Sequence, residues 1–322
     1  MQIRRDVRGV VLCVIAFILS IQIIAALVVY GIAIVQNAES IMSAVDNVGD
    51  PTNALLMNLL SEYVNEAMDQ YLGVGMIIGM LCGLPWLFLI RGKLFISSDI
   101  PRINSKANFS MLFILLLCVF GIQGFMALMF AVFEPLFNQG GGSLTEVLEE
   151  STSSLAITFW GALYIAVIGP ICEELVFRGA VMRKLERYGS NFAIIVSSLL
   201  FALYHMILFQ AVFAFFIGII LAYTAGRFSL KWAILLHMIN NSMAILATYV
   251  NSEILTAALG MTYLASFVVA IVVLIVRRDL LVAQKAAGAP SEPRVYARAF
   301  VSPWLICYLI LTGLFSVLVV FA

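Results

Sequence analysis

Nine long apolar runs constrain the fold of this chain more than any other feature. A helix needs about 20 predominantly apolar residues to cross the hydrocarbon core of a bilayer. Backbone in lipid must satisfy its own hydrogen bonds, and the alternating pattern of a membrane barrel is absent, so we expect these runs to be helices. The prediction is an all-α, polytopic transmembrane bundle of about nine spans, at about 9–35, 71–90, 109–133, 154–177, 191–208, 210–226, 232–250, 256–276 and 301–321.

Composition agrees with a membrane protein. Only 11% of the residues are charged and 63% are hydrophobic, whereas a soluble domain carries roughly 25% charged residues. Water therefore cannot be the solvent for most of the surface. The five cysteines lack the close spacing of a zinc or redox pair, so no cysteine-based site is indicated.

The distribution of basic residues predicts the orientation. With the N-terminus in the cytoplasm and nine spans, all 18 Lys and Arg residues fall on the inner side, as the positive-inside rule requires. The outer segments 36–70 and 134–153 carry acidic residues instead. We expect segment 36–70 to be a solvated loop, with an amphipathic helix on the outer leaflet as the alternative. A bacterial plasma membrane is the expected location.

Ionisable side chains at membrane depth are costly, so they are candidates for function. Glu173 and Glu174 directly follow an apolar stretch, and Arg178 comes four residues after Glu174. Positions i and i+4 share a helix face, which predicts a Glu174–Arg178 pair. Glu173 is turned about 100° away around the helix and stays free to titrate.

Both histidines of the chain lie within apolar runs. His205 is separated from Glu173 by 32 residues, and His237 follows His205 by another 32. Asn241 shares the helical face of His237. Since each group comes from a different expected helix, three faces could converge on one polar cavity.

These residue types suffice to hydrolyse an acyl bond. A glutamate in an apolar setting is a suitable general base, neutral imidazoles bind a metal or donate hydrogen bonds, and an asparagine amide can stabilise an oxyanion. Structural readings stay open, because intramembrane histidines and asparagines also join helices and Glu174–Arg178 could be a structural pair. A proton-coupled transporter is disfavoured, since the Gly169-Pro170 break has no counterpart elsewhere in the chain.

Three short motifs follow one another on separate apolar helices: Glu173-Glu174-x-x-x-Arg178, Phe201-x-x-x-His205 and His237-x-x-x-Asn241. Together they resemble the motifs of the CPBP intramembrane proteases. That family includes the CAAX prenyl endopeptidases of the Rce1 type and bacterial Abi proteins linked to bacteriocin processing and self-immunity. The resemblance covers about 154–250, which implies a catalytic core there, with N-terminal helices in 1–153 and C-terminal helices in 251–322.

The resemblance implies an intramembrane endopeptidase in which Glu173 activates water. His205 and His237 would position that water or a metal, and Asn241 would help to stabilise the oxyanion. A non-catalytic scaffold or bacteriocin-immunity protein of the same fold is the alternative.

The resemblance leaves the cofactor open. Either Zn²⁺ is held by Glu173, His205 and His237, or the mechanism is metal-free and relies on the glutamate alone. Glu174 and Arg178 would support the site by their pairing. Expected partners are membrane lipid and a hydrophobic or lipidated peptide substrate, with no nucleic acid and with the oligomeric state undetermined.

Overall fold

The computed structural model describes residues 2–48, 54–140, 158–250, 252–276 and 293–321, together with Ser143 and Leu155. Within these ranges the chain is helical apart from short turns, and its one isolated backbone bridge joins Ile103 to Ser229. The all-α prediction is confirmed. The expected outer segment 134–153 and the inner loop after 276 lie partly outside the described residues.

The elements, in chain order, are α1 (Gln2–Gln36), α2 (Ala38–Val48), α3 (Ala54–Gly83), α4 (Leu87–Arg91), α5 (Phe109–Gln139), α7 (Phe159–Leu163), α8 (Gly169–Glu174), α9 (Arg183–Leu185), α10 (Ser190–Tyr204), α11 (Leu208–Arg227), α12 (Leu230–Val250), α13 (Glu253–Val276), α15 (Pro293–Phe300) and α16 (Pro303–Phe321). Two π-helical segments, η3 (Tyr164–Ile168) and η4 (Leu175–Met182), flank α8 on its two sides.

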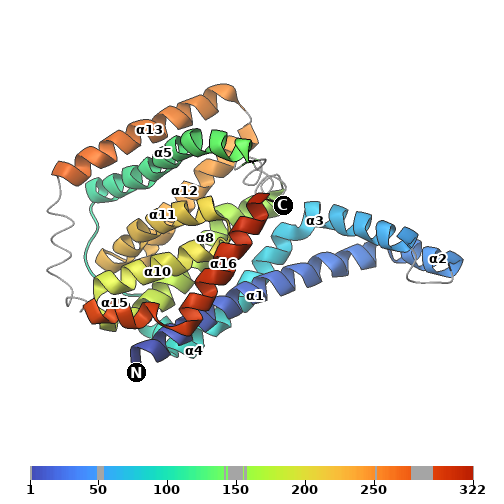
Figure 1. Ribbon diagram of the computed structural model, residues 1–322, viewed down its shortest axis with the longest axis horizontal. Helices are drawn as coiled ribbons and strands as arrows, with labels where there is room; N and C mark the ends of the chain where they lie inside the picture. The colour runs from blue at the N-terminus through green and yellow to red at the C-terminus, as the bar shows by residue number, and fades with distance from the viewer. Residues whose placement is uncertain are drawn as a thin grey trace.

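Helices α1 and α3 pack along each other and extend together away from the rest of the bundle, with α2 at their far end (Figure 1). A Cβ atom added to Gly79 would lie 2.8 Å from the Cα atom of Ile21, so a glycine permits this close approach. Val64 and Ala67 of α3 are buried against Val29 and Ala33 of α1.

The expectation of a solvated loop at 36–70 is therefore wrong for most of that segment. Its described residues form α2 and the first part of α3. The apolar residues in this acidic segment recur at helical spacing and cover the end of α1, which a loop could not do.

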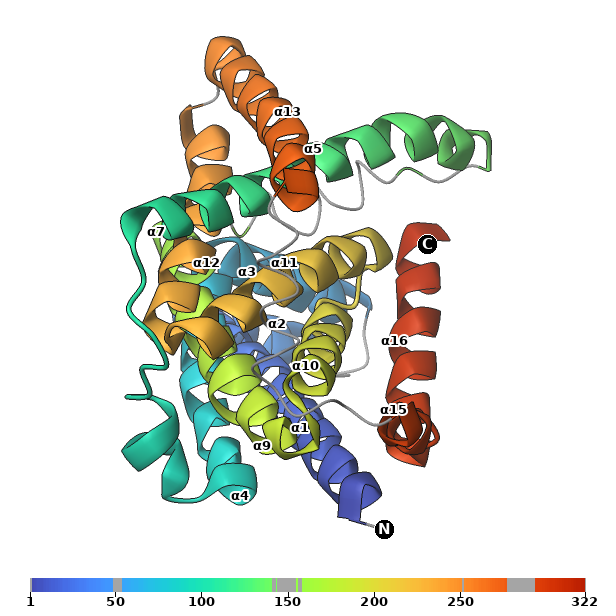
Figure 2. The same ribbon diagram turned by 90° about the vertical axis from the view of Figure 1, so that its left-hand side faces the viewer.

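The centre of the bundle consists of α10, α11, α12 and the broken helix from Phe159 to Tyr188. Helices α5 and α13 form an outer pair on one side of α11 and α12 (Figure 1). Helix α16 lies on the other side, next to α10 and α11 (Figure 2). The pocket described below is lined by residues between Ile18 and Ala244, so helices from the N-terminal and central parts of the chain surround it.

Six described helices are long and apolar enough to cross a membrane, and a seventh span results if the pair α15–α16, bent by 61°, is counted as one. These findings show an integral, multi-pass membrane protein, but the expected count of about nine is too high. Helix α10 has only 15 residues, about 22 Å at 1.5 Å per residue. Helix α12 is long enough, but it carries Lys231, His237, Asn240 and Asn241 and does not meet the same measure.

Several basic segments meet at one end of the bundle, close to the N-terminus. Arg102 pairs with Glu186 at 2.8 Å, and Asp6 lies 3.3 Å from Arg187. The side chain of Asn104 donates to the carbonyl of Gly226 at 2.7 Å. These contacts join segments that the charge pattern assigns to the cytoplasmic side, as expected if they share one face of the membrane.

Candidate active site

The two glutamates lie on a short α-helical turn inside an irregular helix. Gly169 N–H donates to the carbonyl of Tyr164, five residues back, in the π-helical pattern. The next donor in that pattern would be Pro170, which has no N–H. The carbonyl of Ile165 is therefore free for another partner, and the side-chain amide of Asn241 donates to it at 2.9 Å. Interruptions of this kind are frequent at functional sites.

Glu174 and Arg178 form the pair that their spacing predicts. Arg178 Nη1 donates to Glu174 Oε1 at 2.6 Å, and neither side chain is exposed. Arg178 Nη2 donates to the carbonyl of Gly218 on α11 at 3.0 Å. The pair therefore links the broken helix to α11 beneath the site.

His237 on α12 lies between the two glutamates. Its Nδ1–H donates to Glu174 Oε1 at 3.0 Å, which leaves Nε2 unprotonated in the neutral ring. Nε2 lies 3.7 Å from Glu173 Oε2, too far for a direct hydrogen bond. Glu174 thus sets the tautomer of His237, and the free nitrogen faces Glu173.

His205 caps the end of α10. Its Nδ1–H donates to the carbonyl of Phe201 at 2.9 Å, so its Nε2 is free as well. The ring of Phe201 makes edge contacts with His205 and His237, at centroid distances of 4.9 and 5.7 Å. The guanidinium of Arg178 covers Phe201 at 4.3 Å from the ring centroid. The sequence marked Phe201 only as a member of the second motif. In the structure its ring packs against both imidazoles and holds them in place.

The turn after His205 has an unusual backbone. Met206 has a φ of 60°, a left-handed conformation that costs a residue other than glycine on the order of 1–3 kcal/mol. The carbonyl of Met206 accepts a hydrogen bond from the hydroxyl of Ser316 on α16. Ser316 was not expected from the sequence, since a serine in an apolar helix gives no sign of its partner.

A chain of side-chain amides holds Asn241. Gln123 Nε2 on α5 donates to Asn240 Oδ1 at 2.9 Å, and Asn240 Nδ2 donates to Asn241 Oδ1 at 3.1 Å. One hydrogen of Asn241 Nδ2 goes to Ile165, and the other stays available. Sequence reasoning missed Gln123, although a glutamine at membrane depth in a helix as apolar as α5 is itself a signal.

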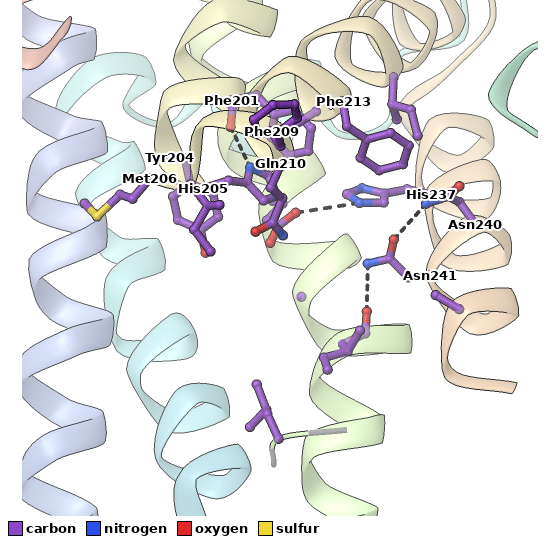
Figure 3. A pocket seen from close by; sticks show the side chains of 18 of the residues that line it. Phe201, Tyr204, His205, Met206, Phe209, Gln210, Phe213, His237, Asn240 and Asn241 are labelled. Atoms are coloured by element: carbon purple, nitrogen blue, oxygen red, sulfur yellow. Dashed lines mark hydrogen bonds and ion pairs between the residues drawn. The ribbon is translucent and has the colours of Figure 1, made fainter. Parts of the chain in front are cut away.

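These residues surround a pocket of about 570 Å³, within the range typical of ligand sites. Four of the six candidate residues line it, namely Glu173, His205, His237 and Asn241. Figure 3 shows the last three of them around the cavity. Glu174 and Arg178 do not line it but lie behind its wall. The three helical faces named from the sequence are thus brought together in one cavity.

The zinc hypothesis can be compared with this geometry. Among the residues that the structure describes, no three His, Cys, Asp or Glu side chains come together as a metal site. Glu173, His205 and His237 are not grouped as metal ligands in this arrangement, although each imidazole keeps its Nε2 free while Nδ1 is engaged. The zinc hypothesis stays a prediction. The chemistry below is derived from protein groups alone.

Comparison with known families agrees with the motifs. Residues 155–243 match the family described as type II CAAX prenyl endopeptidase Rce1-like. The match covers this segment alone, which is called the Rce1-like domain below. The resemblance read from the three motifs is confirmed, and the match supports a protease role. Neither the comparison with curated proteins nor that with solved structures found a match.

All six candidate residues fall inside the Rce1-like domain. Several groups that complete the pocket lie outside it, including Gln123 on α5 and Met76 on α3. The domain therefore depends on the flanking helices for part of its cavity. The three-part division at 153 and 250 stays a prediction.

Replacing Gln123 by leucine is expected to lower kcat for peptide cleavage about tenfold, with little change in KM. The hydrogen bond that orients Asn240, and through it Asn241, is worth on the order of 1 kcal/mol. Steady-state kinetics of the purified variant test this, with Gln139→Leu at the exposed end of α5 as the matched control. An unchanged kcat would show that the amide chain plays no part in the reaction.

Proposed function

We propose that this protein is an intramembrane endopeptidase that hydrolyses a peptide bond of a membrane-associated or lipidated substrate. The observation that carries the proposal is the carboxylate of Glu173. It lines the pocket, is only 7% exposed, and has no hydrogen bond to any described residue. A carboxylate in that position is available to take a proton from water.

In the proposed first step, water binds between Glu173 and the unprotonated Nε2 of His237. Glu173 Oε2 and His237 Nε2 are 3.7 Å apart, a separation that one water molecule can bridge by donating a hydrogen bond to each atom. Glu173 takes one proton as the water oxygen attacks the carbonyl carbon of the substrate. The carbonyl oxygen then carries the negative charge of the tetrahedral intermediate.

The free N–H of Asn241 is the proposed donor to that oxyanion. The amide chain from Gln123 fixes its direction before substrate arrives, and preorganised donors of this kind stabilise the transition state strongly. Glu173 then gives its proton to the departing nitrogen. The C–N bond breaks, and a carboxylic acid and an amine are released.

The test is hydrolysis by the purified protein in detergent. A quenched farnesylated peptide and a panel of short hydrophobic peptides serve as probes, and mass spectrometry identifies the products. Cleavage by the wild type that is absent from a folded Glu173→Ala variant supports the proposal. Equal cleavage by both proteins contradicts the glutamate mechanism and favours a non-catalytic scaffold with a contaminating activity.

Removal of metals is expected to leave the rate unchanged. The reason is that Glu173, His205 and His237 are not arranged as a set of metal ligands. The measurement is the cleavage rate before and after treatment with 1,10-phenanthroline, with the zinc content of the protein determined in parallel. A rate that is lost on chelation and restored by Zn²⁺ alone would show instead that the three residues rearrange around a metal.

A further inference from the structure

Two glutamines line the pocket without a role in the mechanism above. Gln22 belongs to α1 and Gln210 to α11, and Gln210 extends into the cavity beside Phe209 (Figure 3). Neither side-chain amide has a hydrogen bond to any residue in the described part of the chain. The other amides in the pocket wall, those of Gln123, Asn240 and Asn241, are all paired.

Gln210 is half-buried, whereas Gln22 lines the cavity from an exposed position. For Gln210 an unpaired amide is unfavourable, because it has given up part of its hydration without gaining a partner. The surrounding wall is mostly apolar, with Met126, Phe130 and Phe213 among its members. Apolar lining alone would suit a hydrocarbon chain, which has no use for a hydrogen-bonding group. The two glutamines therefore indicate a ligand with uncharged donors and acceptors of its own.

A peptide group matches these requirements. It has one N–H donor and one C=O acceptor. The side-chain amide of glutamine can accept from that N–H and donate to that C=O. A peptide bond must leave a helix before Glu173 can reach it, and its neighbours then lose their intrahelical partners in a medium that supplies none. Side-chain amides that accept and donate at those groups lower the cost of unwinding.

We propose that Gln22 and Gln210 bind backbone peptide groups of an unwound, apolar substrate segment next to the bond that is cut. This inference rests on the proposed endopeptidase function and names the part of the substrate that is recognised. It makes both glutamines substrate-positioning residues. Gln22 lies outside the Rce1-like domain, so the N-terminal helix contributes directly to recognition.

The test measures binding and cleavage of one probe, a fluorescent farnesylated peptide, and of variants with a single backbone amide replaced by an ester. An ester lacks the N–H donor and is a weaker acceptor. Binding is measured by fluorescence anisotropy to the full-length chain carrying Glu173→Gln, so that no turnover is needed. Gln22→Leu and Gln210→Leu are added singly to that background and to the wild type.

At one ester position, binding to the Glu173→Gln protein is expected to weaken about tenfold, roughly the loss of one hydrogen bond. The same ester has no further effect once the contacting glutamine is leucine. Gln36→Leu is the matched control, because Gln36 lies on α1 outside the pocket and bonds Tyr71 at 3.1 Å. It keeps the full sensitivity to every ester.

The outcomes separate this proposal from the proposed function. Ester-dependent binding that Gln22→Leu or Gln210→Leu removes, without cleavage by the wild type, supports backbone recognition and contradicts proteolysis. Cleavage with identical ester effects in all variants supports proteolysis and overturns backbone recognition by these glutamines. Absence of any binding of the probe to the Glu173→Gln protein overturns it as well.

Discussion

Replacing Glu173 by glutamine is expected to lower kcat at least about 10³-fold and to leave the stability of the fold nearly unchanged. General-base catalysis contributes 10²–10⁴-fold, and glutamine keeps the size of the side chain while losing the ability to take a proton. The fold should tolerate the change because Glu173 has no hydrogen bond to a described residue to lose. Cleavage of the farnesylated probe and thermal unfolding in detergent measure the two effects.

The neighbouring glutamate provides an internal comparison. Glu174 accepts from both Arg178 and His237, so Glu174→Gln should lower stability as well as activity. Glu66→Gln, an exposed glutamate on α3, is the matched control and should change neither. If Glu173→Gln keeps more than a tenth of the wild-type kcat, another group is the base.

Replacing Arg178 by methionine is expected to destabilise the protein by about 3–5 kcal/mol, the usual result of leaving one charge of a buried pair without its partner. Arg178 and Glu174 are both fully buried, and Arg178 also bonds the carbonyl of Gly218. The free energy of unfolding in a mixed-detergent titration is the measurement.

A double variant tests the cause. Adding Glu174→Gln to Arg178→Met removes the orphaned charge, so part of the lost stability should return. Arg187→Met is the matched control, because 44% of the Arg187 side chain is exposed and its partner Asp6 keeps Lys184 at 3.8 Å. An exposed arginine of this kind is expected to contribute about 0–1 kcal/mol. A double variant no more stable than the single one would show that lost packing, not charge, is responsible.

Local regularities account for what the sequence predicts well. Helical spacing alone pairs Glu174 with Arg178, and the described residues of the apolar runs lie almost entirely on helices, with the turn at 205–207 as the main exception. The positions of Glu173, His205 and His237 on separate helices suggested their convergence. Helix length does not establish a crossing, however, and the short α10 and the polar α12 account for the excess in the predicted number of spans.

The rest depends on contacts that no local pattern encodes. Gln123 and Asn240 are 117 residues apart, and Met206 and Ser316 are 110 apart. The helix α2 at the outer end depends on packing between α1 and α3, since its acidic composition resembles that of a loop. The π-helical turns around α8 depend on Pro170 and on the helices that pack against this segment. The proline is visible in the sequence, but the packing is not.

The hydrogen bond from Ser316 to Met206 has a consequence for folding during synthesis of the protein. Translation proceeds from the N-terminus, so the strained turn after His205 is synthesised well before the helix that holds it. A separation of 110 residues corresponds to roughly 5–20 s at the usual rate of about 5–20 residues per second. Residues up to Asn241, and with them all three motifs, are complete for most of that interval, while the turn at Met206 still lacks its hydrogen bond from α16.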